Sequence, residues 1–190
     1  MAILKIRRMG DPVLAQVAAP VPDPGDPAIA TLIADMLETM IDADGAGLAA
    51  PQVGVPLRVV VFQAPAARST GPEDGEEAFD HAAPLTVLIN PAVSMLEGPE
   101  ESGWEGCLSV PGLRGKVPRA SHIRYTGLTP DGTVIVREAR GFHARVVQHE
   151  CDHLDGVLYP QRMRDLKELI FESEWRRHLA AAKGEDRADG

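Results

Sequence analysis

Apolar residues recur at the spacing of an α-helix shortly after the start of the chain. Asp26-Pro27 is typical of a helix start, because proline fits the first helical position. The apolar positions that follow keep the i, i+3, i+4 spacing of one helix face, and they are Ile29, Leu32, Ile33, Met36, Leu37, Met40 and Ile41. We predict a helix here whose apolar face packs on the core.

Shorter apolar runs, bounded by turn residues, predict strands. Leu57–Phe62 and Thr86–Ile89 are almost continuously apolar, which is typical of buried strands. Ile123–Leu128 and Val134–Ala139 flank the turn sequence Pro130-Asp131-Gly132. We expect these two runs to form a β-hairpin.

Helical spacing returns between Gly141 and Gly156. The apolar residues of this segment fall on two sides, with Phe142 and Val146 on one side. The second stripe consists of Val147, Cys151 and Leu154. A helix that is apolar on two faces is buried, so we predict a buried helix from residue 141 to residue 154.

A last helix is predicted to begin near Asp165, where Glu168 lies three residues on, as in a capping box. Its apolar residues are Leu166, Leu169, Ile170 and Leu179. This stripe favours docking on the domain over contact with a partner. The order of the segments predicts an α+β fold of mostly antiparallel β-sheets packed around the central helix at 141–154, with an N-terminal and a C-terminal helix.

Length and composition fit one domain, because the chain has 190 residues of which 44% are hydrophobic. We predict a single domain over residues 1–183, with an exposed loop insertion at 63–84 and a disordered tail at 184–190. The net charge of −9 argues against broad nucleic-acid binding, and no apolar run reaches the roughly 20 residues that span a bilayer. The N-terminus has no secretory signal and the chain has two cysteines. We therefore expect a cytoplasmic protein, with an organellar origin and a removed transit peptide left open.

The central helix carries a candidate metal site, since His149 and His153 lie one helical turn apart with Glu150 between them. Two imidazoles at i and i+4 can bind one divalent ion, and the glutamate can reach a water on that ion. The motif also arises by chance, so a surface helix with two unrelated histidines stays an alternative at this point. Cys151 points away from His149 around the helix and is expected to be a buried apolar side chain.

Two further stretches supply polar groups for such a site. A catalytic metal has three protein ligands and one open position, and Cys107, in the glycine-flanked stretch 104–112, is the best candidate for the third ligand. The stretch 45–54 is rich in glycine and alanine and lacks the lysine of a phosphate-binding loop. It can be a simple helix-capping loop, but an amide such as that of Gln52 can also donate to a developing oxyanion.

The three stretches together resemble the signatures of peptide deformylases, which are GxGxAAxQ, EGCLS and HExDH in this order. They match here at residues 45–52, 105–109 and 149–153 without a gap. The resemblance covers most of the chain, from Leu4 to Tyr159. It implies a hydrolase that removes the formyl group from the N-terminal formyl-methionine of new polypeptides.

The resemblance also implies roles for individual residues. The metal ligands would be Cys107, His149 and His153. They would hold one divalent ion per chain, ferrous iron first, with zinc, nickel or cobalt as replacements. Glu150 would be the acid/base residue, with Gln52 and the backbone N–H of Leu108 as oxyanion donors. The substrate-binding residues would be Gly47, Glu105, Arg114, Phe142 and Val146.

One pocket position differs from the family pattern, because Arg145 stands where an aliphatic residue is common. We expect its stem to pack in the pocket wall while its guanidinium reaches solvent. The implied partners are N-formyl-methionyl nascent peptides, and no direct nucleic-acid or membrane binding is expected. A contact between the C-terminal helix and the ribosome stays open as the alternative to docking on the domain.

Two other functions fit the HExxH motif less well. A metallopeptidase of the metzincin type needs a third ligand downstream of the helix, and no histidine follows at that spacing. A non-catalytic metal-binding module needs a closed four-ligand site, and the remaining histidines lie in unrelated contexts.

Overall fold

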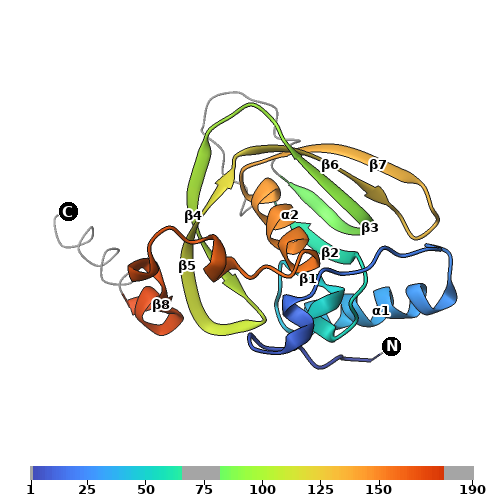
Figure 1. Cartoon of the computed structure of the whole chain (residues 1–190), viewed down its shortest axis with the longest axis horizontal. Coiled ribbons are helices and arrows are strands. Elements are labelled where there is room, and N and C mark those ends of the chain that lie inside the picture. The colour runs from blue at the N-terminus through green and yellow to red at the C-terminus, as the bar shows by residue number, and fades with distance from the viewer. Residues whose placement is uncertain (1, 66–81, 178–190) are drawn as a thin grey trace.

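The computed structural model describes residues 2–65 and 82–177. It has two antiparallel sheets with one long helix, α2 (Gly141–Leu154), between them (Figure 1). The first sheet has the order β1-β2-β3-β6-β7 and the second the order β4-β5-β8. The predicted α+β class with a central helix is confirmed.

The strands are β1 (Gly47–Ala49), β2 (Val59–Ala64), β3 (Ala83–Met95), β4 (Glu100–Cys107), β5 (Val110–Ala120), β6 (His122–Leu128), β7 (Val134–Arg140) and β8 (Ile170–Phe171). Helix α1 spans Pro27–Asp42. Short 3-10 turns lie at Pro12–Ala15, Ala50–Val53, Tyr159–Arg162 and Leu166–Glu168.

Helix α1 begins as predicted, with the Asp26 side chain accepting a hydrogen bond from the Ala28 N–H and Pro27 in the first turn. Its buried apolar residues are Ile29, Ile33, Met36 and Met40. Ile41, which we placed on this face, is 65% exposed. The last turn therefore carries less of the core than the spacing predicts.

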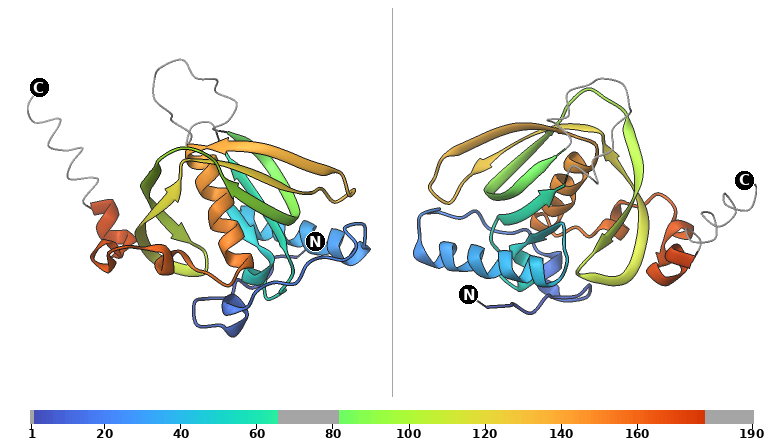
Figure 2. Two further views of the ribbon diagram at one scale, coloured as in Figure 1. Left: turned by 45° about the horizontal axis from the view of Figure 1, so that its top comes forward. Right: turned by 180° about the vertical axis from the view of Figure 1, so that it is seen from behind.

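Strand β2 separates the two main parts of the core. Its alternate residues Val60 and Phe62 pack with α2, while Val59 and Val61 pack with α1. A strand shows this period because successive side chains point to opposite faces. The first sheet thus lies between α1 and α2, and α2 has the second sheet on its other side (Figure 2).

The predicted hairpin at 123–139 is present as β6 and β7, which pair from His122↔Arg140 to Leu128↔Val134. The predicted strand at Thr86–Ile89 lies in the first half of the longer β3. The predicted loop insertion at 63–84 is wrong at its ends, because β2 runs to Ala64 and β3 starts at Ala83. Residues 66–81 of this insertion, Leu179 and the tail at 184–190 lie outside the described residues, and the single domain over 1–183 stays a prediction.

The last helix begins later than we predicted. Asp165 caps only the short turn Leu166–Glu168, and Glu168 forms an ion pair with Lys116 instead of closing a capping box. Residues Ile170–Phe171 then pair with β5 as strand β8, because the edge of β5 offers backbone groups for them. Helical structure starts only at residue 172.

Candidate functional site

Three donor atoms meet between the two sheets. Cys107 ends β4, while His149 and His153 lie on α2, and one donor atom from each lies within 4.8 Å of the other two. The Cys107 Sγ is 3.3 Å from the His153 Nε2. The fold therefore brings together the three residues that the sequence suggested as metal ligands.

The tight connection between β4 and β5 fixes the thiol of Cys107. Residues Cys107 and Val110 pair across this hairpin, and the Ser109 N–H donates to the Sγ at 3.4 Å. The Gln52 amide donates to the same sulfur at 3.5 Å. These two donors hold the sulfur in place, and it is the thiolate form of a cysteine that binds metals.

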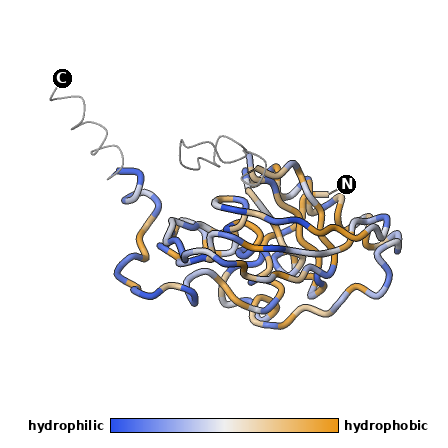
Figure 3. Tube along the Cα trace, turned by 90° about the horizontal axis from the view of Figure 1, so that it is seen from above, coloured by the Kyte–Doolittle hydropathy of each residue, from blue (hydrophilic) through white to orange (hydrophobic). Residues whose placement is uncertain are grey.

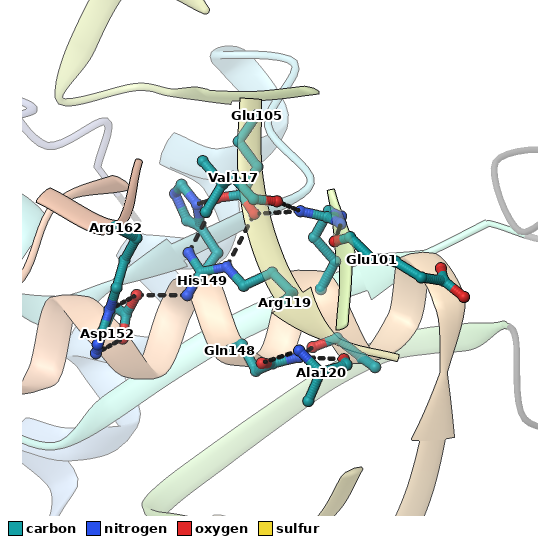
Figure 4. A network of polar contacts seen from close by, with 11 residues as sticks. Glu101, Glu105, Val117, Arg119, Ala120, Gln148, His149, Asp152 and Arg162 are labelled. Atoms are coloured by element: carbon teal, nitrogen blue, oxygen red, sulfur yellow. Dashed lines mark hydrogen bonds and ion pairs between the residues drawn. The ribbon is translucent and has the colours of Figure 1, made fainter. Parts of the chain in front are cut away.

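His149 is oriented by Glu105, whose Oε2 lies 2.8 Å from the Nδ1 (Figure 4). This contact leaves the Nε2 for the donor cluster, as in many carboxylate–histidine–metal sites. Burial would raise the pKa of Glu105, but hydrogen bonds from His149 and Arg119 hold this pKa well below its usual range. Glu105 is thus a carboxylate that positions His149 rather than a proton donor.

Behind Glu105 lies a chain of charged side chains that is buried except at Arg162 and that no sequence pattern indicated. Arg119 binds both oxygens of Glu105, at 2.9 and 3.0 Å, and donates to Asp152 at 2.6 Å. Arg162 pairs with the same Asp152 at 2.7 Å. Glu105 and Asp152 lie inside two of the motifs, on buried elements. Because buried carboxylates need partners, their positions could have indicated that buried cations lie nearby. The network connects β4, β5 and α2 and reaches His149, one of the three donors, through Glu105 (Figure 4).

His153 is suited to bind a cation as a neutral imidazole. Burial lowers its pKa well below the ordinary value, and the neighbouring His149 lowers it further. Within the described residues, its buried Nδ1 has no hydrogen-bond partner. A neutral histidine, a second histidine held by a carboxylate and a thiol form a donor set that fits a divalent transition metal.

Glu150 lies beside the donors and is only 4% exposed. Its Oε2 is buried and finds no partner in the described part of the chain. Burial raises the pKa of Glu150 to about 7. Gly47 makes room for this carboxylate, because a β-carbon at that position would lie 2.3 Å from the Glu150 Oε1.

The amide of Gln52 is held in one orientation. Its Oε1 accepts a hydrogen bond from the Ala49 N–H at 2.8 Å, so the Nε2 points toward Ser109 and Cys107. The side chain is buried at the end of the 3-10 turn that follows β1. The stretch 45–54 is thus more than a capping loop, since it delivers both Gln52 and the space for Glu150.

A cavity of about 540 Å³ opens beside the donors. Every residue that we predicted for the site lines it except His153, which is buried behind. These residues are Gly47, Gln52, Glu105, Cys107, Leu108, Arg114, Phe142, Val146, His149 and Glu150. Phe142, Val146 and Trp104 give the cavity an apolar part in which an apolar side chain can bind.

The guanidinium of Arg145 does not reach solvent as we expected. Its side chain is 14% exposed and donates to the Glu105 Oε1 at 2.8 Å and to the Val117 carbonyl at 2.8 Å. Gly103 allows this position, because a β-carbon there would lie 2.8 Å from the guanidinium carbon. Arg145 therefore forms part of the pocket wall and adds a second cation to Glu105.

The comparison with protein families decides the relationship. The family model described as "Polypeptide deformylase" matches residues 3–169. The chain belongs to the polypeptide deformylase family. It is also 57% identical to "Peptide deformylase 2" of Bordetella bronchiseptica, over 87% of this chain and 90% of that protein.

Solved structures of the family agree with this relationship. A peptide deformylase from Synechococcus elongatus in complex with actinonin is 36% identical, with a TM-score of 0.74 over 88% of this chain and 82% of that one. A Met-Ala-Ser-bound class I type b peptide deformylase from Acinetobacter baumannii is 34% identical, with a TM-score of 0.74 over 85% of this chain and 100% of that one. The resemblance inferred from the three motifs is thereby confirmed.

Family membership establishes the activity. The chain is a metal-dependent hydrolase that removes the N-formyl group from newly made polypeptides. None of the helices in residues 2–65 and 82–177 combines the length and apolar character needed to cross a membrane.

Proposed function

We propose that Cys107, His149 and His153 hold one divalent metal ion, with ferrous iron as the resident ion and zinc, nickel or cobalt able to replace it. Three protein donors with an open position are the pattern of catalytic metal sites. The observation that carries this proposal is the convergence of the three donors beside the buried Glu150, where Cys107, His149 and Glu150 also line the cavity.

A bound divalent ion supplies Lewis acidity, which makes water a stronger acid and polarises a carbonyl group. Glu150 accepts the proton of the attacking water and returns it to the departing amine of the peptide. Its position supports this role, since it lines the cavity and has an oxygen without a partner in the described residues. Burial excludes competing water from this carboxylate.

Gln52 and the backbone N–H of Leu108 are proposed to donate to the oxyanion that develops from the formyl group. The anchored Oε1 of Gln52 keeps its amide hydrogens directed at the site. One of them makes only the long 3.5 Å contact with Cys107, which the amide can exchange for a stronger acceptor. Leu108 lies in the turn between β4 and β5 and lines the cavity.

The first side chain of the substrate, methionine, is proposed to enter the apolar part of the cavity against Phe142 and Val146. Gly47, Glu105 and Arg114 complete the substrate site in this proposal. The partners are therefore N-formyl-methionyl nascent peptides.

We propose that the C-terminal helix contacts the ribosome and that the protein acts in the cytoplasm, where such peptides are made.

Metal removal and reconstitution test the ligand set. Protein stripped with a chelator should lose formate release, and one equivalent of ferrous iron, added anaerobically, should restore it. The cobalt form should show thiolate-to-cobalt charge-transfer absorption, because Cys107 is the sulfur ligand. Cys107→Ser should lose both this absorption and activity.

Cys151→Ala is the matched control, because Cys151 lies on the same helix as the histidines but is buried in the apolar core. It should keep the cobalt absorption and at least half of the activity. Absorption that survives Cys107→Ser would show that the ligand set is wrong.

A further inference from the structure

The C-terminal segment joins the sheet directly beside the cavity. Strand β8 pairs with β5 through Leu113↔Phe171 and Arg114↔Ile170. Arg114 lines the cavity, so the chain that continues from β8 emerges at its rim. Residues 172–177 then form a helical turn that is mostly hydrophilic (Figure 3).

Two side chains of this turn hold Arg114. The Glu172 Oε1 lies 3.3 Å from the Arg114 Nη2, and the guanidinium carbon lies 4.4 Å from the centre of the Trp175 ring. An ion pair on one nitrogen and an aromatic face against the guanidinium restrict the arginine to one orientation. The buried Nε of Arg114 has no acceptor among the described residues, so this cation keeps a donor for a ligand.

Arg176 adds a second cation at the same place. It pairs with Glu172 at 3.0 Å, and both residues line the cavity. Hydrogen bonds from Arg176 and Arg114 lower the pKa of Glu172, so its carboxylate stays ionised at neutral pH. The Arg114–Glu172–Arg176 cluster therefore has two positive charges and one negative charge. Arg145, Asp44, Glu105 and Glu150 line other parts of the cavity, so the cluster is one of two places where its wall carries arginine.

We propose that residues 170–177 belong to the substrate site. Glu172 and Trp175 are positioning residues that hold Arg114 against the peptide backbone, and Arg176 favours substrates with an acidic residue after formyl-methionine. This inference rests on the proposed role of Arg114 in substrate binding. A molecule that binds the C-terminal part of the chain would then change the position of Arg114 through residues 170–177.

Charge preference is measured as kcat/KM for two amidated peptides, formyl-Met-Asp-Ala and formyl-Met-Lys-Ala. The wild-type enzyme should prefer the acidic peptide about two- to fivefold at low salt. This preference should shrink in high salt, because the ion pair between Arg176 and the substrate aspartate is exposed to solvent. Arg176→Glu should reverse the preference. Arg177→Glu is the control, since Arg177 is the next residue and pairs with Glu174 without lining the cavity.

Equal effects of Arg176→Glu and Arg177→Glu would overturn the assignment of Arg176, because they would reflect net charge alone. An unchanged preference in Arg176→Glu would overturn it as well. Absence of formate from both peptides in the wild type would instead refute the proposed function.

The positioning role is tested by separating KM from kcat. Trp175→Ala and Glu172→Gln should raise KM for formyl-Met-Ala-Ser about three- to tenfold and change kcat less than twofold, because they act on a binding residue and not on the donors. Circular dichroism should show that both variants fold. An unchanged KM, or a fall in kcat alone, would contradict the positioning role.

Discussion

Replacing Glu150 by glutamine is expected to lower kcat for deformylation by about 10²- to 10⁴-fold, the usual contribution of a positioned acid/base group. Glutamine has the same shape and still fits above Gly47, but its amide cannot accept the proton of the attacking water. The carboxylate is buried, and its Oε2 has no hydrogen-bond partner among the described residues. Metal content should stay at one ion per chain, because Glu150 is not among the three donors.

Formate release, measured with metal content on the same samples, tests this expectation. Glu138→Gln is the control, since Glu138 is a more exposed carboxylate that pairs with Arg124 on the first sheet. It should keep nearly full activity. A Glu150→Gln enzyme that retains more than a tenth of wild-type kcat would refute the acid/base assignment.

Replacing Arg119 by methionine is expected to lower the free energy of unfolding by about 3–5 kcal/mol, the cost of breaking a buried ion pair. Arg119 is 5% exposed and lies between Glu105 and Asp152, which are also buried. Methionine fills much of the space but leaves Glu105 without its two hydrogen bonds from Arg119. Arg145 and Arg162 retain partial contacts with the two carboxylates, so we expect destabilisation and not loss of folding.

Denaturant unfolding of the metal-free proteins measures this effect without a contribution from metal binding. Arg124→Met is the matched control, because the Arg124–Glu138 pair is exposed and such pairs contribute about 0–1 kcal/mol. If Arg119→Met and Arg124→Met lower the free energy of unfolding equally, the buried ion pairs of Arg119 stabilise the fold no more than an exposed pair does, and the prediction is wrong.

The sequence predicted best where a regular period and a local motif coincide. The 3.6-residue period and Asp26-Pro27 located α1 to the residue at its start. Gly141 and the spacing up to Leu154 located α2 equally well, and with it the relative position of His149 and His153. These elements depend on contacts between residues close in the sequence, which local patterns record.

Elements that depend on distant partners were missed. Strand β4 consists of mostly polar and small residues, so no alternation marks it, yet it pairs with β5 over its length and carries Cys107. The segment after Asp165 has helical spacing, but the open edge of β5 takes two of its residues into a strand. Arg119 and Arg145 could not be assigned from the sequence, because their partners Glu105 and Asp152 come from other elements. The three motifs contain the proposed metal ligands, the proposed acid/base residue and the proposed oxyanion donors, whereas only the fold shows the charged side chains packed beside them.

The deformylase centre is tested most directly by formate release from formyl-Met-Ala-Ser, measured on the enzyme loaded anaerobically with ferrous iron, with acetyl-Met-Ala-Ser under the same conditions for comparison. We expect formate from the formyl peptide in amounts proportional to bound iron, and no acetate from the acetyl peptide. A loaded protein with one metal ion per chain that releases no formate would contradict the assignment of this site as a deformylase centre.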